Sequence, residues 1–175
     1  LMQRDRNTDD IYISYSTPKT PSRTFIYNLK TKEKKLVKEQ IIPSGHNSND
    51  YIVERLECEG HDGRISPITI TRKKTTKLDG NSNLLLYGYG SYGNSMWPSF
   101  SSTRLSLINR DIIWATAHIR GGMERGMKWW KEGKLLNKKN TFQDYISCAK
   151  FLIDKKYTSK KKIIGMGGSA GGLLM

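Results

Sequence analysis

Three short apolar segments, each followed by glycines, constrain the fold of this 175-residue chain more than any other feature. They lie at residues 84–87, 111–119 and 161–168. Continuous apolar runs of this length are typical of strands buried on both faces of a parallel sheet. Helical patterns between them favour an α/β fold with parallel strands. The sequence therefore predicts three glycine-rich loops at one carboxyl edge, where the sites of such folds form.

Two helices are predicted between these strands. Residues 140–156 carry apolar side chains at helical spacing, namely Phe142, Tyr145, Ile146, Ala149, Leu152 and Ile153. Thr141 and Asp144 form a capping-box pattern at the start of this helix, and lysines stand at its end. A shorter helix is predicted at residues 101–110.

The first part of the chain has a different pattern. Alternating segments bounded by turn residues predict strands at residues 11–17, 24–29, 36–42, 51–58 and 65–72. The first three are typical of a β-meander or a propeller blade. Residues 43–50 form a polar linker. We therefore expect a division into residues 1–49 and residues 50–175.

The third glycine-rich turn holds a candidate nucleophile. Residues 167–171 fit the pattern G-x-S-x-G with Ser169 at its centre, after a predicted buried strand and before a helix start. In such a nucleophile elbow the serine lies on a strained turn, and the N–H of the next residue, Ala170, is free to stabilise an oxyanion. Glycine-rich turns also bind phosphates, and a dinucleotide fingerprint starting at Gly165 stays an alternative, although its third position is Ala170.

Five stretches carry a wider resemblance. The segments LLLYGYGSYG, RLSLINR, AHIRGGMERG, WWKEGKLLNKKNTFQDY and MGGSAGGLLM resemble successive motifs of the prolyl oligopeptidase family of serine peptidases, in particular its oligopeptidase B members. The resemblance implies the end of a β-propeller and linker at residues 1–49. Residues 50–175 would then be the N-terminal, incomplete portion of an α/β-hydrolase domain with a truncated, mostly parallel sheet. It further implies a cytoplasmic peptidase without cofactor or metal, which cleaves short peptides after Arg or Lys.

The same resemblance implies roles for individual residues. Ser169 would be the acylated nucleophile, and the N–H of Ala170 and the hydroxyl of Tyr89 would form the oxyanion hole. Tyr92 would lie near the pocket for the residue that precedes the cut. For the stretch R-G-G-x-E we expect a structural role at the edge of the site, with Arg120 and Glu124 as a local ion pair.

The sequence departs from the family pattern in its catalytic partners. In α/β hydrolases the catalytic Asp and His follow the serine in the chain. Here His46, His61 and His118 all precede Ser169. We expect the first two at the surface and His118 in a structural role. A serine without a base in reach is a poor nucleophile. We therefore expect a fragment that is inactive alone, whose last strand lacks a neighbour and exposes an apolar edge. A complementing C-terminal polypeptide stays open as a partner.

A second departure concerns specificity. Trp97 and Ser99 stand where bacterial members of the family carry two carboxylates. The preference for paired basic residues is therefore not implied for this chain. Short basic peptides remain the substrates that the resemblance implies.

Composition bounds the remaining alternatives. The formal net charge is +14, and the lysine runs are predicted to be solvated surface. A nucleic-acid-binding module would use these lysines with Trp129 and Trp130, but no recognised binding motif supports it. An esterase of the same fold is a further alternative, because an elbow alone does not specify peptide bonds. No apolar stretch is long enough for a membrane helix, and Cys58 and Cys148 are expected to be free thiols.

Overall fold

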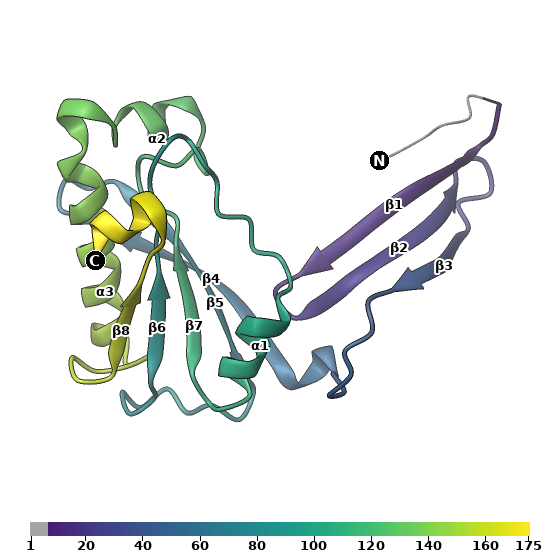
Figure 1. Cartoon of the computed structure of the whole chain (residues 1–175), viewed down its shortest axis with the longest axis horizontal. Helices are drawn as coiled ribbons and strands as arrows, with labels where there is room; N and C mark the ends of the chain where they lie inside the picture. Colours follow the sequence, from purple (N-terminus) through teal and green to yellow (C-terminus); the bar gives the residue numbers. More distant parts are fainter. Residues whose placement is uncertain (1–6) are drawn as a thin grey trace.

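The computed structural model describes residues 7–175, which form two separate β-sheets (Figure 1). The first sheet is antiparallel, with the order β1-β2-β3, and holds β1 (Asp10–Thr17), β2 (Thr20–Asn28) and β3 (Lys34–Glu39). It confirms the meander expected near the N-terminus, although β3 ends three residues before the predicted strand does. Its strands are largely exposed or half-buried.

The second sheet has five strands in the order β4-β5-β7-β6-β8. They are β4 (Tyr51–Glu59), β5 (Ile65–Lys73), β6 (Leu84–Tyr87), β7 (Ile113–Ala117) and β8 (Ile163–Met166). Strands β6, β7 and β8 are parallel, as predicted, whereas β4 and β5 form an antiparallel hairpin that joins the sheet through β7. The three glycine-rich turns therefore leave the same edge of the sheet (Figure 1).

Helices cover the two faces of this sheet. The helices are α1 (Ser102–Ile108), α2 (Met127–Lys131) and α3 (Lys139–Asp154), and short 3₁₀ helices form η1 (Ser48–Asp50), η2 (Leu135–Asn137) and η3 (Ser169–Leu174). Leu84 and Leu86 pack with α3, and Leu85 and Tyr87 pack with α1. This alternation follows from the two-residue period of a strand. Both predicted helices are confirmed, while α2 lies in a segment for which no helix was predicted.

The start of α3 differs from the prediction. The residue before the helix is Lys138, which makes no capping hydrogen bond through its side chain. Thr141 and Asp144 are both buried, so they do not form a capping box at the surface. The Oγ1 of Thr141 instead donates to the backbone oxygens of Arg120 and Gly133, at 2.8 and 3.1 Å. The capping-box prediction is wrong because these side chains face the loop after β7.

The two cysteines lie in one part of the core. Cys58 on β4 and Cys148 on α3 belong to the same hydrophobic cluster, are 1% and 0% exposed, and are free thiols, as expected. A hydrogen bond with Cys58 and burial together raise the pKa of Cys148. The same hydrogen bond lowers the pKa of Cys58, so only Cys148 is held firmly in its protonated, unreactive form.

Strand β8 has a free edge. Within residues 7–175 it pairs with β6 alone, and Ile164 and Met166 are 53% and 45% exposed. The prediction of an apolar strand that lacks one neighbour is confirmed. The same feature overturns the expectation that residues 161–168 form a strand buried on both faces. In the part of the chain that the structure describes, none of the helices has both the length and the apolar character needed to cross a bilayer.

Candidate active site

Ser169 lies on a tight turn between β8 and η3. Its φ of +53° is in the left-handed region, which is strained for a residue with a side chain, and its side chain is exposed. Gly167 faces the backbone oxygen of Gly171 so closely that a Cβ atom at Gly167 would overlap it. The turn therefore has the geometry that the elbow pattern predicts, a serine presented at the tip of a strained strand-to-helix junction.

The loop after β6 lies directly against this turn. The N–H of Gly88 donates to the oxygen of Met166 at 3.1 Å, which continues the β6–β8 ladder to the elbow. A Cβ atom on Gly171 would come within 2.8 Å of the oxygen of Gly88 and 3.3 Å of the ring of Tyr89. The structure thus brings the segment around Ser169 and Ala170 next to the loop that holds Tyr89.

Tyr92 lies further along the same loop. It also adopts a left-handed conformation, with φ +57°, and its side chain is 77% exposed. Tyr92 and Ala170 both line a pocket of about 360 Å³ beside the elbow. Two of the four predicted site residues, Tyr92 and Ala170, therefore line one pocket, and Ser169 precedes Ala170 in the chain.

The loop after β7 is anchored by a buried arginine. Arg120 is 1% exposed and donates from Nε to Oδ2 of Asp144 at 2.8 Å, and from Nη1 and Nη2 to the two carboxylate oxygens of Asp62 at 2.5 and 3.1 Å. Its backbone N–H also donates to Asp144, at 3.0 Å. Burial disfavours the charge of Arg120, but these carboxylates outweigh it and raise the arginine pKa above its usual value. The predicted ion pair with Glu124 is wrong, because Asp62 and Asp144 occupy the guanidinium.

Glu124 lies against a different group. Its Oε1 accepts a hydrogen bond from the N–H of Met96 at 2.9 Å and lies 3.6 Å from Nδ1 of His118. His118 is 1% exposed and its Nε2 bonds to Oγ1 of Thr69 at 2.8 Å. The structural role expected for His118 is confirmed, and Glu124 ties the loop after β6 to the loop after β7.

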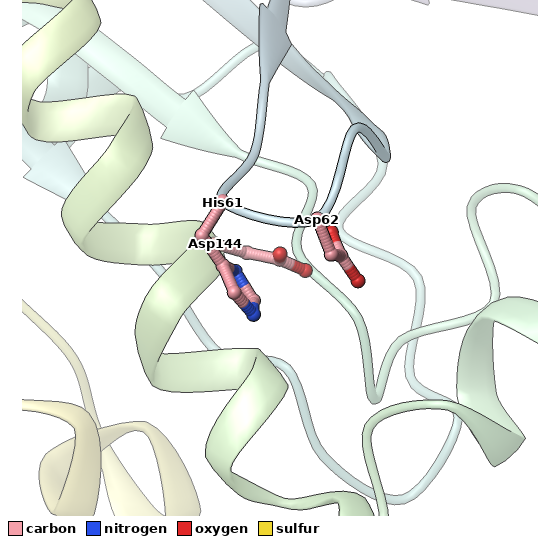
Figure 2. Close-up of side chains that lie close together, drawn as sticks. All are labelled: His61, Asp62 and Asp144. Atoms are coloured by element: carbon pink, nitrogen blue, oxygen red, sulfur yellow. The ribbon is translucent and has the colours of Figure 1, made fainter.

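Figure 2 shows a cluster with the side-chain types of a cation site. His61, Asp62 and Asp144 present possible ligand atoms within 4.8 Å of one another. The carboxylates of Asp62 and Asp144, however, both bind the guanidinium of Arg120. A metal ion would have to compete with this buried positive charge, so the cluster is better explained as the counterion of Arg120.

Lys138 was missed by the sequence analysis, which assigned its run of lysines to solvated surface. Its Nζ donates to the oxygen of Gly90 at 2.6 Å and to Oγ of Ser91 at 2.8 Å, inside the loop that carries Tyr89. The side chain is half-buried, and burial lowers the lysine pKa. Only its position next to an amphipathic helix, in the run N-K-K-N, could have drawn attention to it.

The other two histidines lie away from the elbow. His46 is half-buried rather than a surface residue, because it stacks on Tyr51 at 5.1 Å and its Nε2 bonds to the oxygen of Lys19 at 2.8 Å. His61 is exposed, as expected. Among the described residues, no histidine or carboxylate hydrogen bonds to Oγ of Ser169.

Trp97 and Ser99, at the positions of the missing acidic pair, are exposed. Trp97 lines a larger cavity of about 730 Å³ on the α1 face of the sheet, together with Arg104, Trp114 and Met166. Burial lowers the pKa of Arg104. This cavity carries an arginine and no carboxylate in its described lining, so it offers no counterion for a basic side chain.

The fold and the elbow define an α/β-hydrolase domain with a serine at its strand-to-helix turn. The model of the family described as "Prolyl oligopeptidase family" matches residues 98–175. Residues 98–175 therefore belong to this family of serine peptidases.

Relatives match nearly the whole chain. It is 43% identical over 172 residues to dipeptidyl aminopeptidase BI of Pseudoxanthomonas mexicana, across 98% of this chain and 24% of the relative. It is 39% identical over 175 residues to protease 2 of Moraxella lacunata, across 100% of this chain and 25% of the relative. The solved structure of oligopeptidase B from Leishmania major has a TM-score of 0.88 and 37% identity, across 98% of this chain and 24% of that one.

These matches also settle the fold class. The chain spans about a quarter of the length of the relatives it matches. Its first sheet corresponds to the end of a β-propeller, and its second sheet to the N-terminal part of an α/β-hydrolase domain, as the sequence predicted.

Proposed function

We propose that Ser169 is the nucleophile of a peptidase that cleaves short peptides through an acyl-enzyme. The observation that carries this proposal is the left-handed turn at Ser169, packed against the loop of Tyr89. The hydroxyl oxygen of Ser169 would attack the peptide carbonyl, and the amine would leave with a proton. The N–H of Ala170 and the hydroxyl of Tyr89 would donate hydrogen bonds to the oxyanion.

Cleavage after Arg or Lys belongs to the same proposal. It rests on the resemblance to oligopeptidase B, a name also carried by the Leishmania major structure. One relative is named a dipeptidyl aminopeptidase and another a prolyl endopeptidase. Of these two modes of cleavage we propose the endopeptidase mode, in keeping with the resemblance to oligopeptidase B. The division at residues 49 and 50 and a cytoplasmic location remain part of this proposal.

The chain alone is expected to hydrolyse peptides too slowly to detect. Its described residues would supply Ser169 and the two proposed oxyanion donors, Ala170 and Tyr89, but they place no base at the serine hydroxyl. An oxyanion hole without the rest of a triad retains only a small part of the rate. A polypeptide that brings an aspartate and a histidine to Ser169 would restore activity.

Labelling with a fluorophosphonate tests the assignment. We expect slow labelling of the 175-residue chain at Ser169, which Ser169→Ala abolishes and Ser106→Ala, at an exposed position of α1, leaves unchanged. Tyr89→Phe removes one oxyanion donor and should slow labelling about 100-fold. Labelling that persists in Ser169→Ala, or the absence of labelling in a folded chain, would contradict the proposal.

An aldehyde peptide tests the specificity. Serine adds to a C-terminal aldehyde to give a hemiacetal, in which the hydroxyl proton ends on the new oxygen, so binding reports the pocket without turnover. In the presence of a polypeptide that completes the domain, we expect an N-blocked peptide ending in argininal to bind more tightly than its norleucinal analogue. Equal affinities would contradict a preference for basic residues.

A further inference from the structure

The pocket beside the elbow has a distinctive charge. It has a volume of about 360 Å³ and is lined by Ser91 and Tyr92 from the loop after β6, by Lys134 and Lys138 next to α3, and by Ala170 from η3. None of the described residues that line it is acidic. Two positive charges therefore face one hollow within reach of the predicted oxyanion donor.

Among the residues that the structure describes, Lys138 has no anionic partner. The two hydrogen bonds of its Nζ go to neutral oxygens, those of Gly90 and Ser91. An ammonium carries three N–H donors, so one remains for a ligand. Because a half-buried charge with neutral partners is costly, an anion in the pocket would lower the free energy of the site.

Lys134 is held in place by an aromatic ring. Its Nζ lies 3.7 Å from the centroid of the Trp130 ring, a cation–π contact that orients the ammonium without neutralising it. The nearest acidic side chain in sequence, Glu132, is engaged by Arg64 at 3.0 Å and faces Lys128 at 3.8 Å. The charge of Lys134 therefore also remains available to a ligand.

We propose that this pocket is a subsite for a carboxylate of the bound peptide, held by Lys134 and Lys138. The carboxylate is either the free C-terminus of a short peptide or an acidic side chain near the cleaved bond. The inference rests on the proposed peptidase function, because the pocket borders Ala170. It also means that the basic side chain of a substrate is not accommodated in this pocket.

Two pairs of peptides test the subsite on the 175-residue chain carrying Ser169→Ala, by isothermal titration. Acetyl-trialanine is compared with its C-terminal amide, and acetyl-Ala-Asp-amide with acetyl-Ala-Asn-amide. We expect the carboxylate member of at least one pair to bind about tenfold more tightly, as a charge-assisted hydrogen bond predicts. The first pair reports a C-terminal carboxylate and the second an acidic side chain.

Lysine variants locate the effect. Lys134→Met should reduce the preference for the carboxylate to about one-third or less of its value, and Lys138→Met should do the same. Lys150→Met, at an exposed position of α3, should leave it unchanged. Lys134→Met makes no change to the hydrogen bonds of Gly90 and Ser91, so it keeps the test valid if Lys138→Met disturbs the loop.

Several outcomes would overturn the subsite. They are equal binding of carboxylate and amide in both pairs, no binding at millimolar peptide, and a preference that survives both lysine variants. Fluorophosphonate labelling of the chain with Ser169 intact distinguishes failure of the subsite from failure of the proposed function. Labelling without a carboxylate preference rejects the subsite alone, whereas a carboxylate preference without labelling rejects the role of Ser169 and supports the pocket.

Discussion

At the scale of single residues, the most consequential contact is the one between Arg120 and Asp144. Both side chains are buried, at 1% and 0% exposure, and they join the loop after β7 to α3. Removing one partner of such a pair leaves the other charge buried without compensation. The pair therefore fixes the loop geometry more than it raises the net stability.

Asp144→Ala should lower the free energy of unfolding by about 3–5 kcal/mol, because it leaves Arg120 with Asp62 alone. Urea denaturation followed by circular dichroism measures the change. Asp154→Ala, at an exposed position at the end of the same helix, is the matched control and should change the midpoint little. Equal effects of the two substitutions would show that the buried pair does not hold the loop.

Asp62 gives the same network a pH dependence. Burial opposes its ionisation, but hydrogen bonds from Arg120 and the N–H of Arg64 hold the pKa of the Asp62 carboxyl below its usual value. A lowered carboxyl pKa contributes stability above the unfolded value of about 3.9, and this is lost as the pH falls through the folded value.

The melting temperature should therefore fall more steeply below about pH 4 in the parent chain than in Asp62→Asn. Scanning calorimetry between neutral and acidic pH measures both curves. Parallel curves would mean that the Asp62 carboxylate contributes nothing that depends on its charge.

At the scale of elements, much of the fold was predictable from sequence. The apolar runs located β6, β7 and β8, and helical spacing located α3, because burial imposes these periods on the chain. The turn at Ser169 followed from its glycines. The ends of the elements were less predictable. Thr141 and Asp144 have the spacing of a local capping box, but in the structure they hydrogen bond to the loop after β7 instead.

The roles of Lys138 and Asp62 were not predictable. Both depend on residues far away in sequence, Gly90 for the lysine and Arg120 for the aspartate. A run of lysines and a turn of polar residues look the same whether they face water or a buried partner. The candidate site was thus predicted at its nucleophile and missed in the side chains that support it.

Thr141→Val tests whether α3 is held by the loop. The substitution keeps the shape of the side chain but removes the donor to Arg120 and Gly133, so we expect a loss of roughly 1–3 kcal/mol in the free energy of unfolding. Thr141→Ser should recover most of it, and Thr103→Val, at an exposed position of α1, should have little effect. A valine variant as stable as the parent would contradict this role.

At the scale of the whole molecule, two features act against each other. The free edge of β8 exposes apolar side chains and unpaired backbone groups, which favours pairing with another copy. The net charge of +14 opposes association through mutual repulsion. Salt screens this repulsion without covering the edge.

We expect the chain to self-associate, and to do so more strongly as the salt concentration rises. Ile164→Lys places a charge on β8 and should shift the distribution toward monomer, whereas Ile41→Lys, at an 85% exposed position outside the sheets, should shift it less. Sedimentation velocity at low and high salt measures the distribution. A monomer at every concentration and salt would contradict this expectation.

The two buried thiols can report transient opening of the hydrophobic core. Cys58 and Cys148 belong to β4 and α3, so a thiol reagent reaches either one only when strand and helix part. In the native protein the rate of thiol modification then depends on how often the core opens locally, rather than on the intrinsic reactivity of the thiol alone. Loss of the Arg120–Asp144 pair, which anchors α3 to the loop after β7, would therefore raise the rate of thiol modification at both cysteines. This increase would come before any change in overall shape.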